Sequence, residues 1–255
     1  MKHIRSFSLF EGVRSSDDGY AFDFHSDNDG EIMSLKFLDR RSVKMTAGDT
    51  TYRYYYCYEF EHGLDRTLLK KLKMFDDTIK PHDMDLLVSK GVQGLDHRHR
   101  LNTFDCIVYP KSSSLLLKEF SKSCEAKSGV AELVPDAFVK SSVADVKFDT
   151  DAIERIGNAS TRKQIYKAID HIKSGESIAM KEIYPPYRKF VKDFIKFDKA
   201  DDRHVFNLVH DKKVLLIDDY RTTGSTLKEM MGQLLKFSPR EVVICIVIRV
   251  IDGRK

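Results

Sequence analysis

The chain has few cysteines and no long apolar segment. Its four cysteines among 255 residues are Cys57, Cys106, Cys124 and Cys245, and no two of them have CxxC spacing. This scatter argues against a zinc ribbon and against a disulfide framework. An apolar stretch of about 18 residues, which a membrane-spanning helix needs, is missing, as is an apolar N-terminal segment of the signal-peptide type. We therefore expect a cytoplasmic protein with reduced thiols and no membrane partner.

The chain also has little net charge. A formal charge of +4 with 32% charged residues gives weak support to a polyanionic partner, and a small phosphorylated ligand fits as well.

The histidines lack the spacing of metal ligands. Of the nine histidines, His97 and His99 lie in 96–100 (DHRHR), each followed by an arginine, without a companion cysteine or acid cluster at the required spacing. The preferred interpretation of this segment is a basic loop.

The first hundred residues are predicted to form a β-rich extension followed by a helix. Residues 1–60 alternate short apolar and polar pieces, and 51–60 reads TYRYYYCYEF. Its five tyrosines favour an amphipathic strand with aromatic packing over the alternative, a surface that stacks bases. Residues 62–80 have leucines at helical spacing, with Lys70, Lys71 and Lys73 facing away, which predicts a helix with a solvated lysine face. We expect residues 1–100 to be an extension, which would contribute a hood over the site.

From residue 104 the pattern becomes an alternation of strands and helices, which is typical of parallel βα units with helices on both faces. We expect strands at 104–109, 131–139, 214–217 and 242–248, and helices at 114–123 and 227–237. Pro135 within the second strand indicates an edge or a bulge. Residues 141–200 interrupt the alternation, with candidate helices at 161–172 and 187–197. The core is therefore expected at 101–255, with an insertion or lid at about 141–200.

The segment 214–226, VLLIDDYRTTGST, joins an apolar strand to two acids and a hydroxyl-rich turn. Asp218 and Asp219 supply acceptors for vicinal sugar hydroxyls. The turn supplies hydroxyls, backbone N–H groups and a glycine where the next helix begins, which suits a phosphate. Its members are Thr222, Thr223, Gly224, Ser225 and Thr226. Ordinary turn and cap roles would explain each residue alone but not their conjunction. Since open α/β sheets bind ligands at the carboxyl ends of strands, the segment predicts a pentose-phosphate site.

This segment resembles the phosphoribosyl-pyrophosphate (PRPP) motif of type I phosphoribosyltransferases (PRTases), a strand followed by two acids and TTGxT. The resemblance implies a three-layer α/β fold with a mostly parallel central sheet, here with a long helical insertion and a β-rich N-terminal extension. It implies that Asp218 and Asp219, as the catalytic pair, hold the ribose hydroxyls, and that residues 222–226 hold the 5-phosphate. Tyr220 and Arg221 depart from the usual aliphatic pair of the family. The sequence leaves open whether they flank the ribose or pack outward.

Two further segments resemble elements of this family. The stretch 106–120, CIVYPKSSSLLLKEF, is similar to the strand and loop that bind pyrophosphate, which implies that role for Lys111, Ser112, Ser113 and Ser114. It lacks the glycine that many members carry, and an exposed turn is the alternative. Residues 141–200 stand where members have a mobile loop over PRPP, with candidate anion contacts at Arg162, Lys163, Tyr187, Arg188 and Lys189. The implied cofactor is Mg²⁺, carried in with the pyrophosphate.

Within the family the layout is most similar to the ComF-type branch, through 58–73 (YEFEHGLDRTLLKKLK) and the final strand VVICIVIR, although the zinc element of that branch is missing. Thr222 stands where purine-salvage members have an acid, which disfavours purine salvage. The resemblance implies transfer of phosphoribosyl to an unidentified nucleophile with release of pyrophosphate. Two alternatives stay open: a catalytically silent PRPP or nucleotide-binding regulator of the competence, mobile-element or defence type, and a nucleic-acid partner that contacts the basic insertion. Many members are homodimers.

Overall fold

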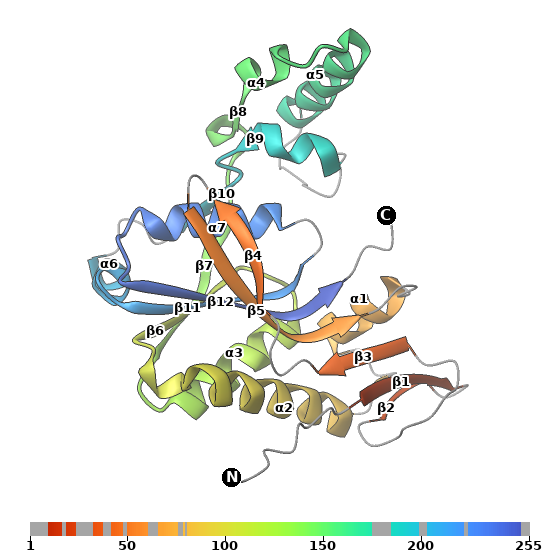
Figure 1. Ribbon diagram of the computed structural model, residues 1–255, viewed down its shortest axis with the longest axis vertical. Coiled ribbons are helices and arrows are strands. Elements are labelled where there is room, and N and C mark those ends of the chain that lie inside the picture. The colour runs from red at the N-terminus through yellow and green to blue at the C-terminus, as the bar shows by residue number, and fades with distance from the viewer. Residues whose placement is uncertain are drawn as a thin grey trace, which may run out of the picture.

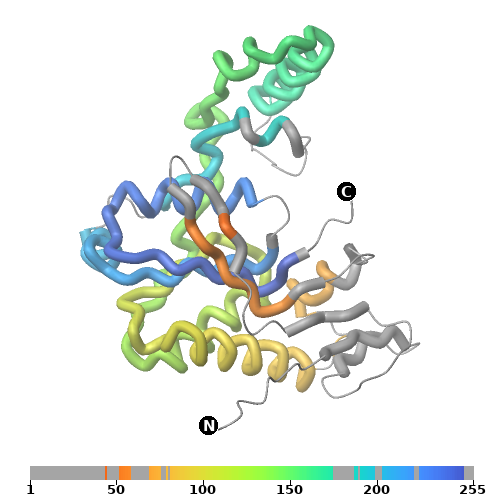
Figure 2. Tube along the Cα trace, in the orientation of Figure 1, coloured from red at the N-terminus to blue at the C-terminus, as the bar shows by residue number. Residues whose placement is uncertain are grey.

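The computed structural model describes residues 10–16, 19–23, 33–37, 42–47, 50–60, 66–75, 79, 81–174, 185–198, 203–221 and 224–250. A central sheet carries helices on both faces (Figure 1). One face is covered by α1 (Arg66–Met74), α2 (Pro81–His99) and α3 (Leu115–Ser128). The other is covered by α6 (Arg203–Val209) and α7 (Ser225–Leu235), and the Cα trace in Figure 2 shows the same layers. The expected three-layer α/β fold is confirmed.

Five neighbouring strands in the middle of the sheet run parallel. Their order is β7 (Glu132–Lys140), β6 (Cys106–Pro110), β11 (Lys213–Arg221), β12 (Glu241–Val250) and β5 (Thr50–Phe60). The antiparallel β10 (Ile195–Phe197) extends the sheet beside β7. At the opposite end β5 pairs antiparallel with β3 (Met33–Phe37) and β4 (Ser42–Ala47), and β1 (Phe10–Ser16) and β2 (Gly19–Asp23) follow β3. The N-terminal region is β-rich, as expected, and its last strand belongs to the parallel core.

The aliphatic strands are buried on both faces, as their continuous apolar character predicts. In β11, Val214 and Leu216 join the core under α6 and α7, whereas Leu215 and Ile217 join the core under α1, α2 and α3. We call these the α6–α7 core and the α1–α3 core. Successive side chains alternate between the two because a strand has a period of two residues.

The tyrosines of β5 pack inside the protein rather than forming a stacking surface. Tyr54, Tyr56 and Tyr58 are buried, and the Tyr58 hydroxyl donates a hydrogen bond of 2.6 Å to the Leu87 carbonyl of α2. This bond satisfies the polar end of a side chain whose ring supplies apolar packing. For these three residues the aromatic-packing interpretation is confirmed.

All four cysteines are buried free thiols. Cys57, Cys124 and Cys245 lie in the α1–α3 core, where the sulfur atoms of Cys57 and Cys245 are 3.8 Å apart. Cys106 lies in the α6–α7 core. Burial, followed by the nearby Asp105 and Glu132, raises the pKa of Cys106 to about 12. The Cys106 thiol is therefore protonated, and all four thiols are shielded from solvent within the two cores.

Two helix predictions and one loop prediction need correction. The expected helix 62–80 is described only as α1 (Arg66–Met74). The expected basic loop at 96–100 is wrong, because His97 and His99 end α2, a helix that the sequence interpretation missed. The expected helix 187–197 is also wrong. It forms the 3-10 helix η4 (Pro185–Phe190), then β9 (Val191–Lys192) and β10. Ile195 and Phe197 face inward and Lys196 outward, which is the period of a strand.

The insertion between β7 and β11 contains a small core of its own. After η2 (Val143–Asp145), β8 (Lys147–Phe148) pairs antiparallel with β9, and α4 (Thr150–Glu154) and α5 (Ala159–Lys173) follow β8. Ile153, Ile165, Ile169 and Phe190 pack together here, in the part that projects at the top of Figure 1. Ion pairs of Lys192 with Asp149 at 2.6 Å and of Lys147 with Asp193 at 2.8 Å cross the β8–β9 pair. Much of 141–200 is thus an ordered helical unit.

Pro135 lies at a bulge, as predicted. The β6–β7 register advances from Val108 opposite Val134 to Pro110 opposite Phe138, so β7 contains two extra residues there. Asp136 within this bulge has a φ of 54°, in the left-handed region. The bulge accommodates a proline in a strand that is paired on both sides.

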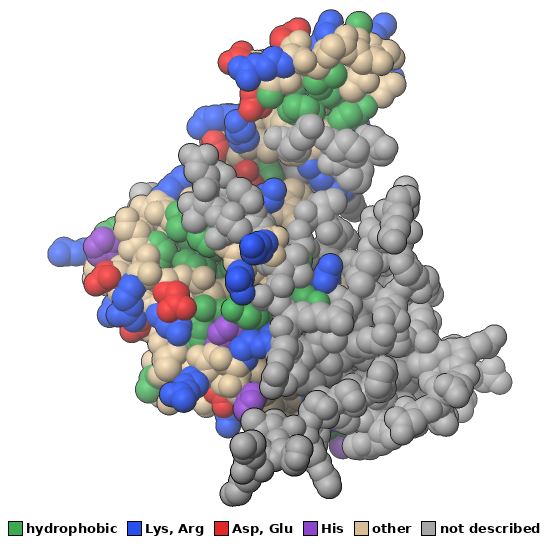
Figure 3. All heavy atoms as spheres, in the orientation of Figure 1, with side chains coloured by type: hydrophobic (Ala, Val, Ile, Leu, Met, Phe, Trp, Pro, Cys, Tyr) green, Lys and Arg blue, Asp and Glu red, His purple; other side chains and the backbone are tan. Residues whose placement is uncertain are grey.

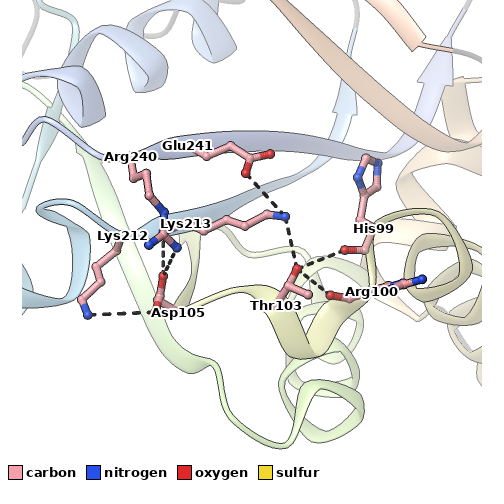
Figure 4. Close-up of polar contacts among 8 residues, drawn as sticks. All are labelled: His99, Arg100, Thr103, Asp105, Lys212, Lys213, Arg240 and Glu241. Atoms are coloured by element: carbon pink, nitrogen blue, oxygen red, sulfur yellow. Dashed lines mark hydrogen bonds and ion pairs between the residues drawn. The ribbon is translucent and has the colours of Figure 1, made fainter.

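Polar contacts fasten the amino ends of three core strands. The Asp105 carboxylate accepts a 2.7 Å hydrogen bond from the Lys213 backbone and is paired with Arg240 at 3.3 Å and Lys212 at 4.0 Å. Lys213 Nζ reaches Thr103 Oγ1 at 3.1 Å and Glu241 at 3.5 Å (Figure 4). Thr103 ends the 3-10 helix η1 (Leu101–Thr103), directly before β6. These contacts align β6, β11 and β12 at the edge opposite their carboxyl ends.

No helix in the described ranges combines the length and apolar character required to cross a membrane.

Candidate functional site

Between β6 and β11 the order of the strands reverses, because the chain connections that follow these two parallel strands lead to opposite sides of the sheet. From β6 the chain passes through α3 to β7, and from β11 it passes through α7 to β12 on the other side. The two helices lie on opposite faces, because right-handed crossovers in opposite directions place their helices on opposite sides of a sheet. The carboxyl ends of β6 and β11 therefore flank the place where open α/β sheets bind ligands.

The two segments predicted to bind ligand meet at this position. Val108 of β6 lies beside Leu216 of β11 in parallel register. Two residues farther along each strand are Pro110, where β6 ends, and Asp218, beyond which β11 continues to Arg221 beside β12. The loop after β6 therefore begins at the level of the acid pair. A common ligand at this edge would contact both segments.

The helix after β11 begins without a side-chain cap. Its N-cap is Gly224, with a φ of 78°, a left-handed conformation that glycine adopts without a steric cost. The helices α3, α4 and α5 all have a capping side chain, from Ser114, Asp149 and Asn158 respectively. The first amide groups of an uncapped helix are suited to an anion. Ser225 and Thr226 are half-buried in this first turn, whereas Thr222 and Thr223 lie outside the described residues.

Asp218 and Asp219 both lie within β11 and differ in burial and in partner. Asp219 is paired with Lys73 of α1, on the α1–α3 side of the sheet. Asp219 is 5% exposed, and Asp218 is half-buried. Each carboxylate accepts a hydrogen bond from the next backbone N–H, at 3.0 Å for Asp218 and 2.7 Å for Asp219. The two acids therefore have different surroundings.

Lys73 of α1 is a site residue that the sequence interpretation missed. Its Nζ lies 2.8 Å from Oδ2 of Asp219 and 4.4 Å from the centre of the Tyr220 ring. The sequence placed Lys73 on a solvated face, and the structure corrects this, since its side chain is 24% exposed. A usable signal was present, because Lys73 follows Leu69 by four residues and so adjoins the apolar side of the helix.

The pKa of Asp218 is raised well above its ordinary value. The main cause is burial, the second is the Asp219 carboxylate, and Lys73 and the backbone N–H of Asp219 act in the opposite direction. An ionised Asp218 is thus costly in the ligand-free protein. A ligand that donates hydrogen bonds to this carboxylate would offset the cost.

Tyr220 packs toward the protein. It is partly buried against the α1–α3 core, with the Lys73 ammonium over its ring. Tyr220 therefore does not pack outward, and its place beside the ribose stays a prediction. The side chain of Arg221 lies outside the described part of the chain.

The loop after β6 uses part of its own polar capacity. The Ser114 side chain is buried and accepts a hydrogen bond of 3.3 Å from Leu117 N, so it caps α3. Ser112 Oγ accepts from Ser114 N at 3.1 Å, and Lys111 N donates to the Phe138 carbonyl at 2.8 Å. The side chains of Lys111 and Ser113 are exposed. Of the four residues predicted to bind pyrophosphate, these two present exposed side chains.

The candidate anion contacts of the insertion are partly occupied within the insertion itself. Arg162 donates to the Ile156 carbonyl and lies 3.8 Å from Glu154. The Tyr187 hydroxyl donates to Gln164 at 2.8 Å, and Arg188 has interactions of its own. Lys163 is exposed, and the side chain of Lys189 lies outside the described residues.

The described residues contain no group of three or more His, Cys, Asp or Glu side chains that could hold a metal ion. His99 packs edge-on against Tyr55 at 4.1 Å, and burial, with help from Arg98 and Lys213, lowers its pKa to about 4. A Mg²⁺ ion that accompanies a phosphorylated ligand needs only one or two protein carboxylates. Asp218 supplies one, whereas Asp219 is paired with Lys73. The donor set thus fits an ion held chiefly by its ligand.

Comparison with protein families gives one match. Residues 141–255 match the family model of the phosphoribosyl transferase domain. The match contains the insertion, β11 and α7, and it leaves out α1 and the loop after β6. A comparison with curated proteins gave no match. The family match supports kinship of this part of the chain with type I PRTases and a function of that type.

Proposed function

We propose, from the phosphoribosyl transferase domain at residues 141–255 and the open edge of the sheet beside it, that the chain binds PRPP and transfers its phosphoribosyl group. In this proposal Asp218 accepts hydrogen bonds from the ribose hydroxyls. The uncapped first turn of α7 and the preceding residues hold the 5-phosphate. The observation that carries the proposal is this neighbourhood of a half-buried carboxylate and a helix that begins at Gly224 without a side-chain cap.

The loop after β6 takes the pyrophosphate in this proposal. It lies at the same level of the sheet as Asp218 and presents the exposed ammonium of Lys111 and the hydroxyl of Ser113. Ser112 and Ser114 act by holding the shape of the loop, through the hydrogen bond between them and the cap on α3. A bound Mg²⁺ would add positive charge to the departing pyrophosphate.

The chain would contribute position and charge rather than covalent chemistry. The bond between C1 of the ribose and the pyrophosphate breaks, pyrophosphate leaves with the electron pair, and an incoming nucleophile forms the new bond to C1. The insertion joins the sheet at the carboxyl end of β7, next to β6, which suits it to close over the ligand and exclude water. The acceptor of the phosphoribosyl group would define the particular enzyme. We also propose that the chain is related to the ComF-type branch of the family.

The test is titration calorimetry of PRPP with Mg²⁺, followed by an assay for pyrophosphate release with bases, amines and water. Asp218→Asn should abolish measurable binding, as should Asp218→Asn combined with Asp219→Asn. Asp85→Asn, which changes an exposed carboxylate on α2, should bind as the wild type does. Ribose 5-phosphate should compete, since it retains the sugar and the 5-phosphate. Unchanged PRPP affinity in the double variant would overturn the proposal.

The release assay separates an enzyme from a regulator. Pyrophosphate release that depends on an acceptor would support transfer, whereas saturable binding without release would assign the chain as a PRPP-binding regulator. A nucleic-acid partner is less favoured, because Lys and Arg side chains are interspersed with Asp and Glu on the face shown in Figure 3. Salt-dependent binding of DNA or RNA that Arg162, Lys163, Arg188 and Lys189 control would be needed to support that partner.

A further inference from the structure

A lysine from outside the matched domain is attached to the proposed sugar site. Lys73 lies in the last turn of α1, and α1 is fixed on the sheet by Leu72, which is fully buried in the α1–α3 core. The Lys73 ammonium is held between the Asp219 carboxylate at 2.8 Å and the Tyr220 ring at 4.4 Å. One side chain therefore contacts the two residues that follow Asp218.

Asp219 requires such a partner because of its location. A carboxylate that is 5% exposed cannot retain its charge cheaply without an opposite charge or several hydrogen bonds. Its Oδ1 accepts one hydrogen bond from Tyr220 N, and Lys73 is the cation beside its Oδ2. Removal of the lysine would leave a buried negative charge shortly before residues 222–226, the phosphate loop of the proposed site. The Asp219 carboxylate would then take up a proton, or the end of β11 would shift.

We propose that Lys73 is a positioning residue of the PRPP site, which fixes Asp219 and Tyr220 so that Asp218 and the phosphate loop are presented to the ligand. This inference rests on the proposed function. It gives the two acids separate roles: Asp218 contacts the ribose, and Asp219 acts through its attachment to α1. It also gives the N-terminal part of the chain a task in the site.

The charges around Asp218 give this proposal a pH signature. Asp219 on the same strand raises the pKa of Asp218, and Lys73 from α1 lowers it. On β12 the residue opposite Asp218 is the uncharged Ile246, and on the other side β6 ends at Pro110. On α7, Glu229 accepts a hydrogen bond from the Asp193 backbone at 3.0 Å. Loss of Lys73 would raise the pKa of Asp218 further. As the pH falls, ligand binding that needs the ionised carboxylate would therefore be lost at a higher pH than in the wild type.

The experiment measures Mg²⁺–PRPP affinity from pH 5 to 8 for the full chain and three variants. Lys73→Met should weaken binding at pH 7 by about tenfold or more, since it leaves a buried charge unpaired. Its acid-side midpoint should move to higher pH. Lys73→Arg keeps the charge and should restore affinity to within about threefold of the wild type. The matched control Lys70→Met removes an exposed lysine from the same helix and should change neither quantity.

A double-mutant cycle separates action through Asp219 from a general loss of stability. If Lys73 acts through Asp219, then Lys73→Met should cost little further affinity once Asp219 is replaced by Asn. Wild-type affinity and an unmoved pH midpoint in Lys73→Met would overturn this inference and leave the proposed function intact. Equal loss in the presence and absence of Asp219→Asn would overturn it as well. Failure of the wild type itself to bind PRPP would overturn the proposed function instead.

Discussion

At the scale of single residues, Asp218 and Asp219 carry similar groups with opposite consequences for stability. Asp219 is buried and paired with Lys73, so its charge is compensated. Asp218 has a raised pKa because of burial and of Asp219. A carboxyl group whose folded-state pKa is raised binds its proton more tightly in the folded than in the unfolded chain. Stability is therefore lost as the pH rises from the ordinary aspartate range through the folded pKa.

Substitutions at the two acids should change the melting temperature in opposite directions. Asp218→Asn removes a charge that is costly when ionised and should raise the melting temperature at pH 7.5 by about 2–4 °C, equivalent to about 1 kcal/mol. Asp219→Asn leaves Lys73 without its counter-charge and should lower it. Calorimetry at pH 7.5 and pH 4 measures both effects.

The pH dependence is the control for this prediction. At pH 4, near the ordinary aspartate pKa of about 3.9, the unfolded chain is itself about half protonated at this residue, so the advantage of Asp218→Asn should shrink. An advantage that is the same at both pH values, or a lower melting temperature in Asp218→Asn at pH 7.5, would contradict a costly Asp218 charge.

At the scale of elements, α2 lies unusually close to β5 and α3 at Gly91. A Cβ atom on this residue would lie 2.8 Å from Cε2 of Phe120 and 3.2 Å from Cε2 of Tyr58. Both rings are buried and cannot move aside. The missing side chain therefore permits the helix to approach the sheet, and this approach brings the Leu87 carbonyl within reach of the Tyr58 hydroxyl.

Two glycine-to-alanine substitutions should separate packing from helix propensity. Gly91→Ala should destabilise the protein by about 1–3 kcal/mol, because overpacking exceeds the gain in propensity. Gly232→Ala, in α7, meets no atom within 4 Å and should stabilise by about 0.5–1 kcal/mol. Urea denaturation of both variants measures the difference, and a stabilising Gly91→Ala would contradict the close contact.

The sequence predicted the elements whose local pattern and tertiary environment agree. The strand at 214–217, the helix at 227–237 and the bulge at Pro135 are of this kind. The segment 187–197 was misjudged because its pairing with β7 and β8 depends on distant residues. The motif 214–226 predicts a site at the end of β11, and this location stays a prediction. The ion pair of Asp219 with Lys73 could not be predicted, because it joins residues that are 146 apart in the sequence.

At the scale of the whole molecule, the N-terminal region and the matched domain share one sheet. β5 pairs with β12 in parallel register from Tyr54 opposite Ile244 to Phe60 opposite Val250. The α1–α3 core takes residues from β5, α1 and α2 as well as from β11 and β12. The division at residue 100 that the sequence suggests therefore passes through a common core.

Truncation tests this dependence. A fragment of residues 101–255 loses β5, α1 and α2, exposes the edge of β12 and uncovers much of the α1–α3 core, so it should fail to unfold cooperatively. A fragment of residues 42–255 keeps those elements together with β4 and should retain a cooperative transition. Thermal melts followed by near-ultraviolet circular dichroism compare the two. Cooperative unfolding of the shorter fragment would show that residue 100 is a true domain boundary.

Because every cysteine is buried, the reactivity of the thiols reports local opening of the protein. A thiol reagent can modify Cys106 only when the α6–α7 layer lifts from the sheet, and Cys57, Cys124 or Cys245 only when the α1–α3 layer does. The labelling rates of the native chain, resolved by mass spectrometry, therefore report the opening of each layer separately. No engineered probe is required, because the two sides of the sheet already carry distinct reporters.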